Sequence, residues 1–309
     1  MEWTRGRFLN EYIPGLFTVA LDSYMSKRAD SMFAKLCNVR DSLKKKEEDS
    51  IRSGLGYPLK KGEGAPISYD VEIEGPKQAW IHNVWALAVR ITEEAIDDNL
   101  YHLRAGGNAD ELSDIFTDLG QSMAMNVEAQ VAQLFNSATV STYHATRFAL
   151  PFAYASHKRL DGSTFSNLAT ASDLTYSTFW ANLIAAENQY DHRQMRIKKN
   201  VNKLWIPPQL ERQATEILKS TDRPDTANRA VNAYASSGRS ISVMKWNEMT
   251  DADMWVLQTD GRGIIFFWAR KTRFAREREF QTGDMMCKAD QRFSVEIADE
   301  RDFYFNVPA

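Results

Sequence analysis

A run of apolar residues at helical spacing in the middle of the sequence restricts the folds that this chain can adopt. It lies between residues 108 and 135, with successive apolar positions three or four residues apart. The pattern predicts a helix of about 28 residues, roughly 42 Å long. That is long for a globular domain, so any fold must accommodate one extended element. Its apolar positions are Leu112, Ile115, Phe116, Leu119, Met123, Val127, Val131, Leu134 and Phe135.

Shorter elements of both kinds follow the long helix. Residues 174–190 have one apolar helical face, and Pro207-Pro208 starts a further helix, with a short strand at 203–207 between the two helices. After a polar segment the pattern changes to strands, at 241–245, 255–259, 264–269, 293–297 and 303–307. The sequence shows no internal repeat and no linker between two domains. We therefore predict an α+β fold with interleaved elements.

Strict alternation of apolar and polar residues between 67 and 73 predicts a strand with one apolar face. Gly75-Pro76 breaks this strand and a second extended run follows at 80–89, so residues 51–90 are predicted to form a long β-hairpin. An isolated hairpin is marginally stable in water, and the Gly- and Pro-rich flank offers it no core. We expect it to lie on another surface, such as that of a neighbouring subunit. The apolar contact residues would be Ile67, Tyr69, Val71 and Ile73.

The composition excludes several classes of protein. Hydrophobic residues at 43% and charged residues at 26% are typical of a globular chain and not of a disordered one. A net charge of −3 argues against a coat that binds nucleic acid by overall charge. The apolar runs are far shorter than the ~18 residues of a membrane span, and two cysteines are too few for a disulfide framework. We expect a soluble, unsecreted protein with no membrane partner.

Motifs for catalysis, metal binding or cofactor binding are missing from the sequence. The five histidines share no i,i+4 spacing, and no GxSxG motif is present. The glycines at 54–64 are followed by prolines and not by a helix that could hold a phosphate. For the acids at 93–98 we favour the ordinary role of carboxylates at a helix start over acid–base catalysis. We therefore predict no enzymatic activity, no cofactor and no metal site.

Two clusters of basic residues are the most distinctive charged features. Such clusters can bind phosphate or pair with acids on a neighbouring subunit, and for a chain of net charge −3 we favour the intersubunit role. The first cluster, a candidate for contact with DNA or with another subunit, contains Arg193, Arg196, Lys198, Lys199 and Lys203. The second, a candidate intersubunit contact, contains Arg270, Lys271, Arg273, Arg276 and Arg278.

The order of these elements resembles that of tailed-bacteriophage major capsid proteins with the Hong Kong 97-type fold. Residues 89–138, which begin VRITEEAIDD, resemble the passage from a strand through an acidic turn to the long spine helix of that family. Asp161-Gly162-Ser163 with Asn167, the strand that Trp255 enters, and the closing strands at 292–301 resemble later stretches. The resemblance covers roughly residues 10–307.

The resemblance implies a division of the chain. Residues 1–50, which show only a helical stretch at 19–38 and exposed charge at 40–48, would be an N-arm, and 51–90 would be an extended loop that lies across an adjacent subunit. Residues 91–138 and 261–309 would form a peripheral domain, and 139–260 an axial domain around the centre of the capsomer.

The resemblance also implies a function and partners. The chain would be a major head protein that assembles in the host cytoplasm into hexamers and pentamers of an icosahedral virion shell around double-stranded DNA. Capsid-like sequence begins within ten residues of Met1, where many relatives carry a scaffolding segment, which implies a separate scaffolding protein. A portal protein, a decoration or cement protein and weakly bound DNA complete the expected partners.

Two other functions stay open at this point. An encapsulin-type shell would use the same fold to enclose a protein cargo. A nucleic-acid-binding α+β module would use the basic run at 193–203 and would be a monomer with salt-dependent affinity for DNA.

Overall fold

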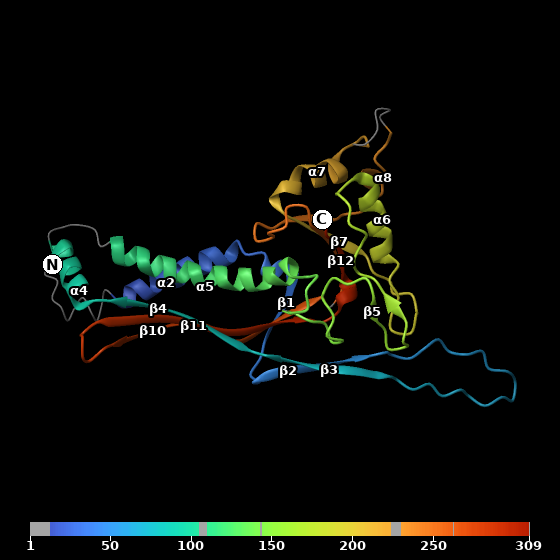
Figure 1. The fold of residues 1–309 in the computed structure, drawn as a ribbon, viewed down its shortest axis with the longest axis horizontal. Helices are drawn as coiled ribbons and strands as arrows, with labels where there is room; N and C mark the ends of the chain where they lie inside the picture. Colours follow the sequence, from blue (N-terminus) through green and yellow to red (C-terminus); the bar gives the residue numbers. More distant parts are fainter. Residues whose placement is uncertain (1–12, 105–109, 143, 224–229, 262, 309) are drawn as a thin grey trace.

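The computed structural model describes residues 13–104, 110–142, 144–223, 230–261 and 263–308. The subunit is elongated, with one long helix beside one long sheet, a second sheet with its own helices at one end, and a β-hairpin that projects beyond that end (Figure 1). The long helix is α5 (Asp110–Asn136), close to the predicted bounds. The α+β class is confirmed.

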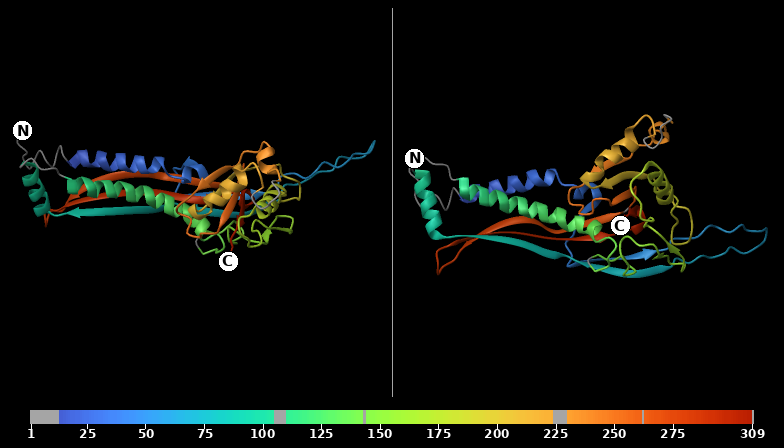
Figure 2. Two further views of the ribbon diagram at one scale, coloured as in Figure 1. Left: turned by 90° about the horizontal axis from the view of Figure 1, so that it is seen from above. Right: turned by 45° about the horizontal axis from the view of Figure 1, so that its top comes forward.

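The long sheet has the strand order β1-β10-β11-β4. Strands β10 (Ile264–Arg278) and β11 (Met285–Ile297) form its antiparallel centre, β1 (Cys37–Asp41) runs parallel to β10, and β4 (Asn83–Ile91) pairs with β11. Helices α2 (Ile13–Ala29) and α5 lie side by side over one face, and α4 (Glu93–Arg104) lies at the far end (Figure 2). A one-turn helix, α3 (Phe33–Leu36), connects α2 to β1.

The close contact between α2 and α5 depends on a glycine. A Cβ atom at Gly120 of α5 would lie 2.1 Å from the carbonyl oxygen of Ala20 and 3.2 Å from the amide nitrogen of Tyr24, both in α2. Ser23 donates a hydrogen bond to the carbonyl oxygen of Thr117 at 3.0 Å in the same contact. The two backbones therefore touch at a point where only glycine fits.

The short sheet has the strand order β12-β9-β7-β8, and α6 and α7 pack against it. Thr175 accepts from the amide of Thr178 and caps the first turn of α6. The polar segment at 220–240 contains one short helix, α8. The bounds of this part are α6 (Tyr176–Glu187), β7 (Val201–Ile206), α7 (Glu211–Lys219), α8 (Ala233–Ser236), β8 (Ser242–Lys245), β9 (Trp255–Thr259) and β12 (Phe303–Asn306), with a two-stranded ladder of β5 (His157–Lys158) and β6 (Thr164–Phe165).

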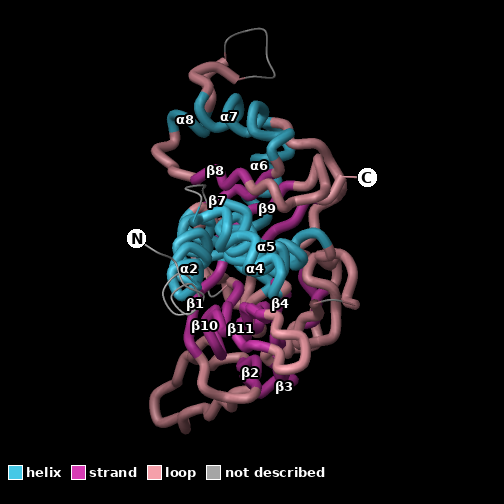
Figure 3. Tube along the Cα trace, turned by 90° about the vertical axis from the view of Figure 1, so that its left-hand side faces the viewer, coloured by secondary structure: helices cyan, strands magenta, loops and turns pink. Residues whose placement is uncertain are grey.

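An aromatic cluster at the end of α5 joins the two sheets. The ring of Phe135 lies edge-on to those of Trp205, Trp246, Phe303 and Phe305, with centroids 5.6 to 6.1 Å apart. The same core continues to the buried residues of β10 and β11. Figure 3 shows helices α2, α4 and α5 between the long sheet on one side and strands β7, β8 and β9 on the other.

The predicted hairpin is correct in its place but wrong in its strands. Strand β2 (Lys46–Arg52) pairs with β3 (Glu74–Ile81), and residues 67–73 form no strand in the structure. The second extended run is divided at His82, after which β4 belongs to the long sheet. Alternation at 67–73 suits a strand, but among the described residues no strand pairs with this segment.

Other predictions near the chain ends need correction. The charged stretch at 40–48 is mostly exposed, as predicted, and its two ends belong to β1 and β2. The helix predicted at 19–38 runs from residue 13 to 29 as α2, and the first twelve residues of the predicted N-arm lie outside the described residues. Strand β12 pairs with β9, so residues 303–306 lie in the short sheet, whereas the boundary at 261 had grouped them with β10 and β11.

We predict that Gly120→Ala lowers the free energy of unfolding of the unassembled subunit by about 1–3 kcal/mol, because the new methyl group overpacks the helix contact. Gly15→Ala is the matched control, since no atom lies within 4 Å of its Cβ position and alanine favours a helix. Urea unfolding measures both. Equal free energies of unfolding in Gly120→Ala and Gly15→Ala would contradict the inference that only glycine fits at position 120.

Candidate assembly surfaces

The hairpin carries a long row of exposed apolar side chains. Its tip, residues 53–73, extends beyond the body of the subunit (Figure 1). Soluble monomers rarely expose so many apolar side chains together, and such surfaces mark sites of interaction. The four apolar residues predicted to contact a neighbouring subunit, Ile67, Tyr69, Val71 and Ile73, are each at least 44% exposed. The exposed apolar side chains of the tip are Leu55, Tyr57, Leu59, Ile67, Tyr69, Val71 and Ile73.

Arg193 holds the tip of the hairpin to the rest of the subunit. Its guanidinium donates to both carboxylate oxygens of Asp70 at 2.8 Å, to the hydroxyl of Ser53 at 3.2 Å and to the carbonyl oxygen of Val71. The hydrogen bond from Arg193, with one from the amide of Gly56, keeps the pKa of Asp70 below its ordinary value. One residue of the predicted first basic cluster thus fixes where the hairpin starts to project.

Arg147 anchors the strands of the hairpin in a second place. It donates to the carbonyl oxygen of Ala298 at 2.5 Å and to Asp49 of β2 at 2.8 Å, with Glu296 3.4 Å away. Its guanidinium also lies over the ring of Trp80 in β3. No pattern in the sequence points to this residue, because its partners lie about 100 to 150 positions away.

The rest of the first basic cluster is divided between the interior and the surface. Lys199 is buried and pairs with Asp302 and, at 3.6 Å, with Asp299. Lys203 donates to the carbonyl oxygen of Lys35. Arg196 and Lys198 are exposed. The five residues therefore do not form one surface.

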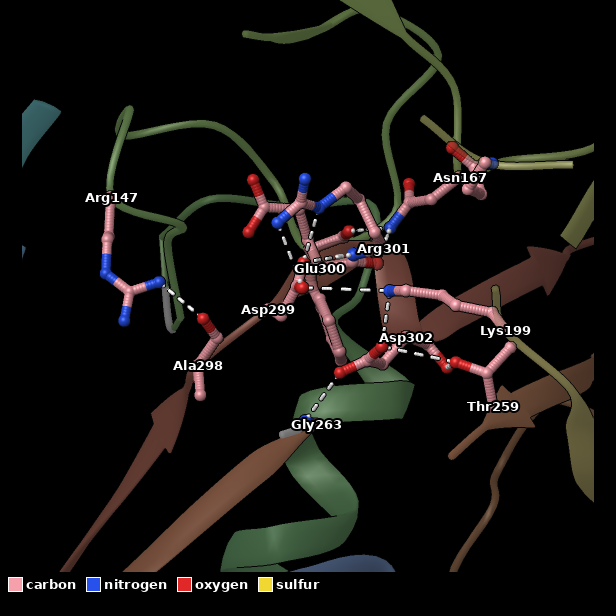
Figure 4. A network of polar contacts seen from close by, with 12 residues as sticks. Arg147, Asn167, Lys199, Thr259, Gly263, Ala298, Asp299, Glu300, Arg301 and Asp302 are labelled. Atoms are coloured by element: carbon pink, nitrogen blue, oxygen red, sulfur yellow. Dashed lines mark hydrogen bonds and ion pairs between the residues drawn. The ribbon is translucent and has the colours of Figure 1, made fainter. Parts of the chain in front are cut away.

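Asp302 is the centre of the buried network around Lys199 (Figure 4). Its carboxylate accepts from Lys199, from the hydroxyl of Thr259 at 3.2 Å and from the amide of Gly263 at 2.7 Å. A Cβ atom at Gly261 would lie about 2 Å from this carboxylate, so the turn after β9 requires glycine there. The network ties β9 and β10 to the segment before β12.

Asn167, one of the residues in the predicted resemblance, has a structural role. It is fully buried, and its side-chain amide donates to the carbonyl oxygens of Phe152 and Glu300 at 2.8 and 3.1 Å. Its side-chain oxygen accepts from the amide of Tyr154 at 2.9 Å. These bonds close the loop between α5 and α6 against the end of the chain.

The second basic cluster lies on β10 and has acidic partners within the subunit. Arg270 and Arg273 both pair with Asp290 on β11, the latter at 2.7 Å. Lys271 lies 3.6 Å from Asp41, and Arg278 pairs with Glu93 at 2.8 Å. Arg276 lies opposite Cys287 on β11. A role of these residues between subunits stays a prediction.

Within the described ranges, no group of three or more His, Cys, Asp or Glu residues is placed to hold a metal ion. Among the same residues, none of the helices has the length and apolar character needed to cross a bilayer.

The family model described as "Phage capsid protein" matches residues 83–304, more than two thirds of the chain. The chain belongs to the phage capsid protein family. Its place is therefore the capsid of a bacteriophage virion, where copies build the shell, and the family is structural and not enzymatic. No curated protein sequence matches the chain.

Solved capsid structures share the fold of this phage capsid protein. A capsid of an empty GTA particle has a TM-score of 0.57 at 13% identity, covering 90% of both chains. The capsid structure of Microbacterium phage Oxtober96 has a TM-score of 0.56 at 10% identity, covering 90% of this chain and 91% of that one. A virus-like particle from Pyrococcus furiosus has a TM-score of 0.52 at 10% identity, covering 96% and 99%. The predicted Hong Kong 97-type fold is confirmed.

We predict that Arg193→Ala increases the rate of proteolytic cleavage within residues 55–72 several-fold, because the base of the tip loses its anchor. Global stability should change by less than about 1 kcal/mol, since Asp70 is partly exposed. Arg212→Ala, which removes an exposed arginine from α7, is the control. Unchanged cleavage in Arg193→Ala would show that the tip is held by other contacts.

A second prediction concerns pH. Burial raises the pKa of Glu296 from 4.5 to about 7, Arg147 opposes the rise, and Asp49 adds to it. The folded state thus binds a proton that the unfolded chain releases above pH 4.5. The stability from this group is complete below pH 4.5 and is lost as the pH rises through about 7.

Glu296→Gln should therefore remove a decline on the order of 1–3 kcal/mol in the free energy of unfolding between pH 5 and pH 8. Urea unfolding of the unassembled subunit at both values measures it. Glu216→Gln, at an exposed position of α7, should leave the decline in place. If the free energy of unfolding fell equally with pH in Glu296→Gln and in the unaltered chain, Glu296 would not be the cause of the decline.

Proposed function

We propose that this capsid protein assembles into hexamers and pentamers that close an icosahedral shell around double-stranded DNA. The observation that carries the proposal is the projecting tip, whose apolar side chains have no cover within the described subunit. An adjacent copy in a symmetric ring would supply the missing surface. Burying these side chains would contribute about 25 cal/mol for each Å² removed from water.

The parts of the subunit follow the predicted division in outline, with β4 moved to the long sheet and β12 to the short one. The long sheet with α2 and α5 would be the peripheral domain, the short sheet with α6 and α7 the axial domain, and the hairpin of β2, β3 and residues 53–73 the extended loop. Helix α2 packs along α5, so the N-arm contributes to the peripheral core in this assignment.

Electrostatic contacts would add to the apolar ones. The open face of the long sheet, opposite the helices, carries Arg90, Lys288 and Arg292, and the tip carries Glu63 and Glu72 together with Lys60 and Lys61. Opposite charges favour one docking orientation over others. Arg270 and Arg273 belong to the same open face, whereas Arg276 and Arg278 lie on the helix side with Cys287 and Met285.

The remaining partners follow from this role. A separate scaffolding protein would guide assembly in the host cytoplasm, a portal protein would occupy one vertex, and a decoration or cement protein would bind outside. Packaged DNA would touch the inner surface weakly. An encapsulin-type shell with protein cargo is the alternative, and the likeness to a virus-like particle keeps it open.

We predict that replacing residues 56–72 by a short glycine linker leaves a folded subunit that forms neither rings nor shells. The deletion removes exposed residues and spares Trp80 and Arg147, which anchor the strands. Light scattering and negative-stain microscopy measure assembly, and urea unfolding measures the fold. Normal shells from the deletion variant would overturn the proposal.

The contents of the shell separate the two kinds of particle. Particles would be purified from infected cells and their nucleic acid detected by absorbance at two wavelengths. Nucleic acid inside the particles would support the proposal of a phage capsid that encloses DNA. Particles that hold only protein would favour the encapsulin-type alternative.

A further inference from the structure

A polar cleft of about 580 Å³ lies between the base of the hairpin and the segment that follows α6. Arg52 and Tyr57 line it from the hairpin, and Arg196 and Lys198 from that segment. A smaller hollow of about 410 Å³ lies next to it, and four residues line both: Arg52, His192, Asp299 and Arg301. Tyr57 also belongs to the exposed apolar row of the tip, whereas the charged residues of the cleft do not.

The charges on the walls of the cleft are not balanced. Five cations line it, and the two carboxylates are Asp191 and Asp299. Asp299 accepts hydrogen bonds from Nε and Nη2 of Arg301 at 2.8 and 3.0 Å, and it lies 3.6 Å from Lys199. Asp191 accepts from backbone amides at 2.7 and 2.8 Å. The cations on the walls are Arg52, Arg196, Lys198, Lys199 and Arg301.

Two of these cations, Arg196 and Lys198, form no ion pair with a carboxylate among the described residues. Arg52 faces Glu74 across the β2–β3 ladder and helps to lower its pKa, although the Glu74 carboxylate lies 3.5 Å from Lys77. The guanidinium of Arg196 lies over the ring of Tyr190, a contact that leaves its N–H groups available. Like charges held together in a cleft repel one another, so a bound anion would relieve the repulsion.

Two buried donors on the same walls also lack a partner in the described structure. The Nη1 atom of Arg301 donates no hydrogen bond, and the Nδ1 atom of His192 takes part in none. His192 is only 4% exposed, and its buried ring stays neutral near pH 7 because burial lowers its pKa to about 4. An oxygen-rich ligand would satisfy groups that are costly to leave unpaired.

We propose that this cleft binds a small compound that carries several phosphate groups. Phosphate offers many acceptor oxygens and multiple negative charge, and its oxygens match the paired N–H groups of arginine. A single carboxylate would neutralise one cation at most. A DNA duplex has the same phosphate chemistry but is convex and rigid, so it would reach only the rim of the cleft.

Binding would join two parts of the subunit. Arg52 belongs to β2 of the hairpin, whereas Arg196 and Lys198 follow α6 in the part that contains the short sheet. A ligand that contacts all three would bridge the hairpin to this part next to the Arg193 anchor. The direction in which the tip projects would then depend on the occupancy of the cleft.

The test uses tripolyphosphate and the purified full chain in its unassembled form. Isothermal titration should show saturable binding, and the melting temperature should rise more than in sodium chloride of equal ionic strength. Arg196→Ala/Lys198→Ala should weaken binding at least tenfold. Lys60→Ala/Lys61→Ala removes two neighbouring cations from the exposed tip and should bind as the unaltered chain does.

Three results would overturn the proposal: no saturable binding, equal weakening in both double variants, or binding of a short DNA duplex in the absence of binding of tripolyphosphate. Because binding is measured on unassembled subunits, any of these leaves the assembly proposal unaffected. Circular dichroism of both double variants confirms that the exposed substitutions preserve the fold.

Discussion

The architecture depends on the aromatic contact between the end of α5 and the strands of the short sheet. Phe135 is fully buried among Trp205, Trp246, Phe303 and Phe305, and the same cluster reaches the rings of β10 and β11. Aromatic pairs at these distances add stabilisation beyond the area that they bury. Among the described residues one core contains side chains of both sheets, so the two sheets pack together as one extended body from which the hairpin projects.

Polar contacts then position what the core leaves exposed. Arg193 and Arg147 hold the hairpin at two points, and Glu128 of α5 accepts from the indole of Trp246 at 2.6 Å and from the amide of Met32 at 2.9 Å. Each of these side chains links segments that are far apart in sequence. The apolar core fixes the framework, whereas a few charged groups determine where the N-terminal helix and the hairpin leave it.

The sequence was sufficient for elements whose apolar pattern is regular, such as α5 and α6, and for the exposed apolar residues 67–73. It was not sufficient for the distal half of β10, because residues 270–278 are mostly charged, are only partly buried and show no regular apolar alternation. It also could not pair Lys199 with Asp302 or place Arg52 beside Arg196, since those contacts join residues more than 100 positions apart. Long-range pairing of single charges leaves no periodic signal in a sequence.

Because α5 is long, a small rotation at one of its ends displaces the other end by a large distance. With 27 residues the helix is about 40 Å long. It packs along α2 and the long sheet, and its end at Phe135 lies in the cluster that joins this part of the subunit to the short sheet. A turn of about 5° at that end would move the far end by about 3.5 Å over this length. Angular differences too small to disturb the packing of the core could therefore set different distances between the ends of adjacent subunits. Curvature of a closed surface could vary from place to place while every copy keeps the same fold.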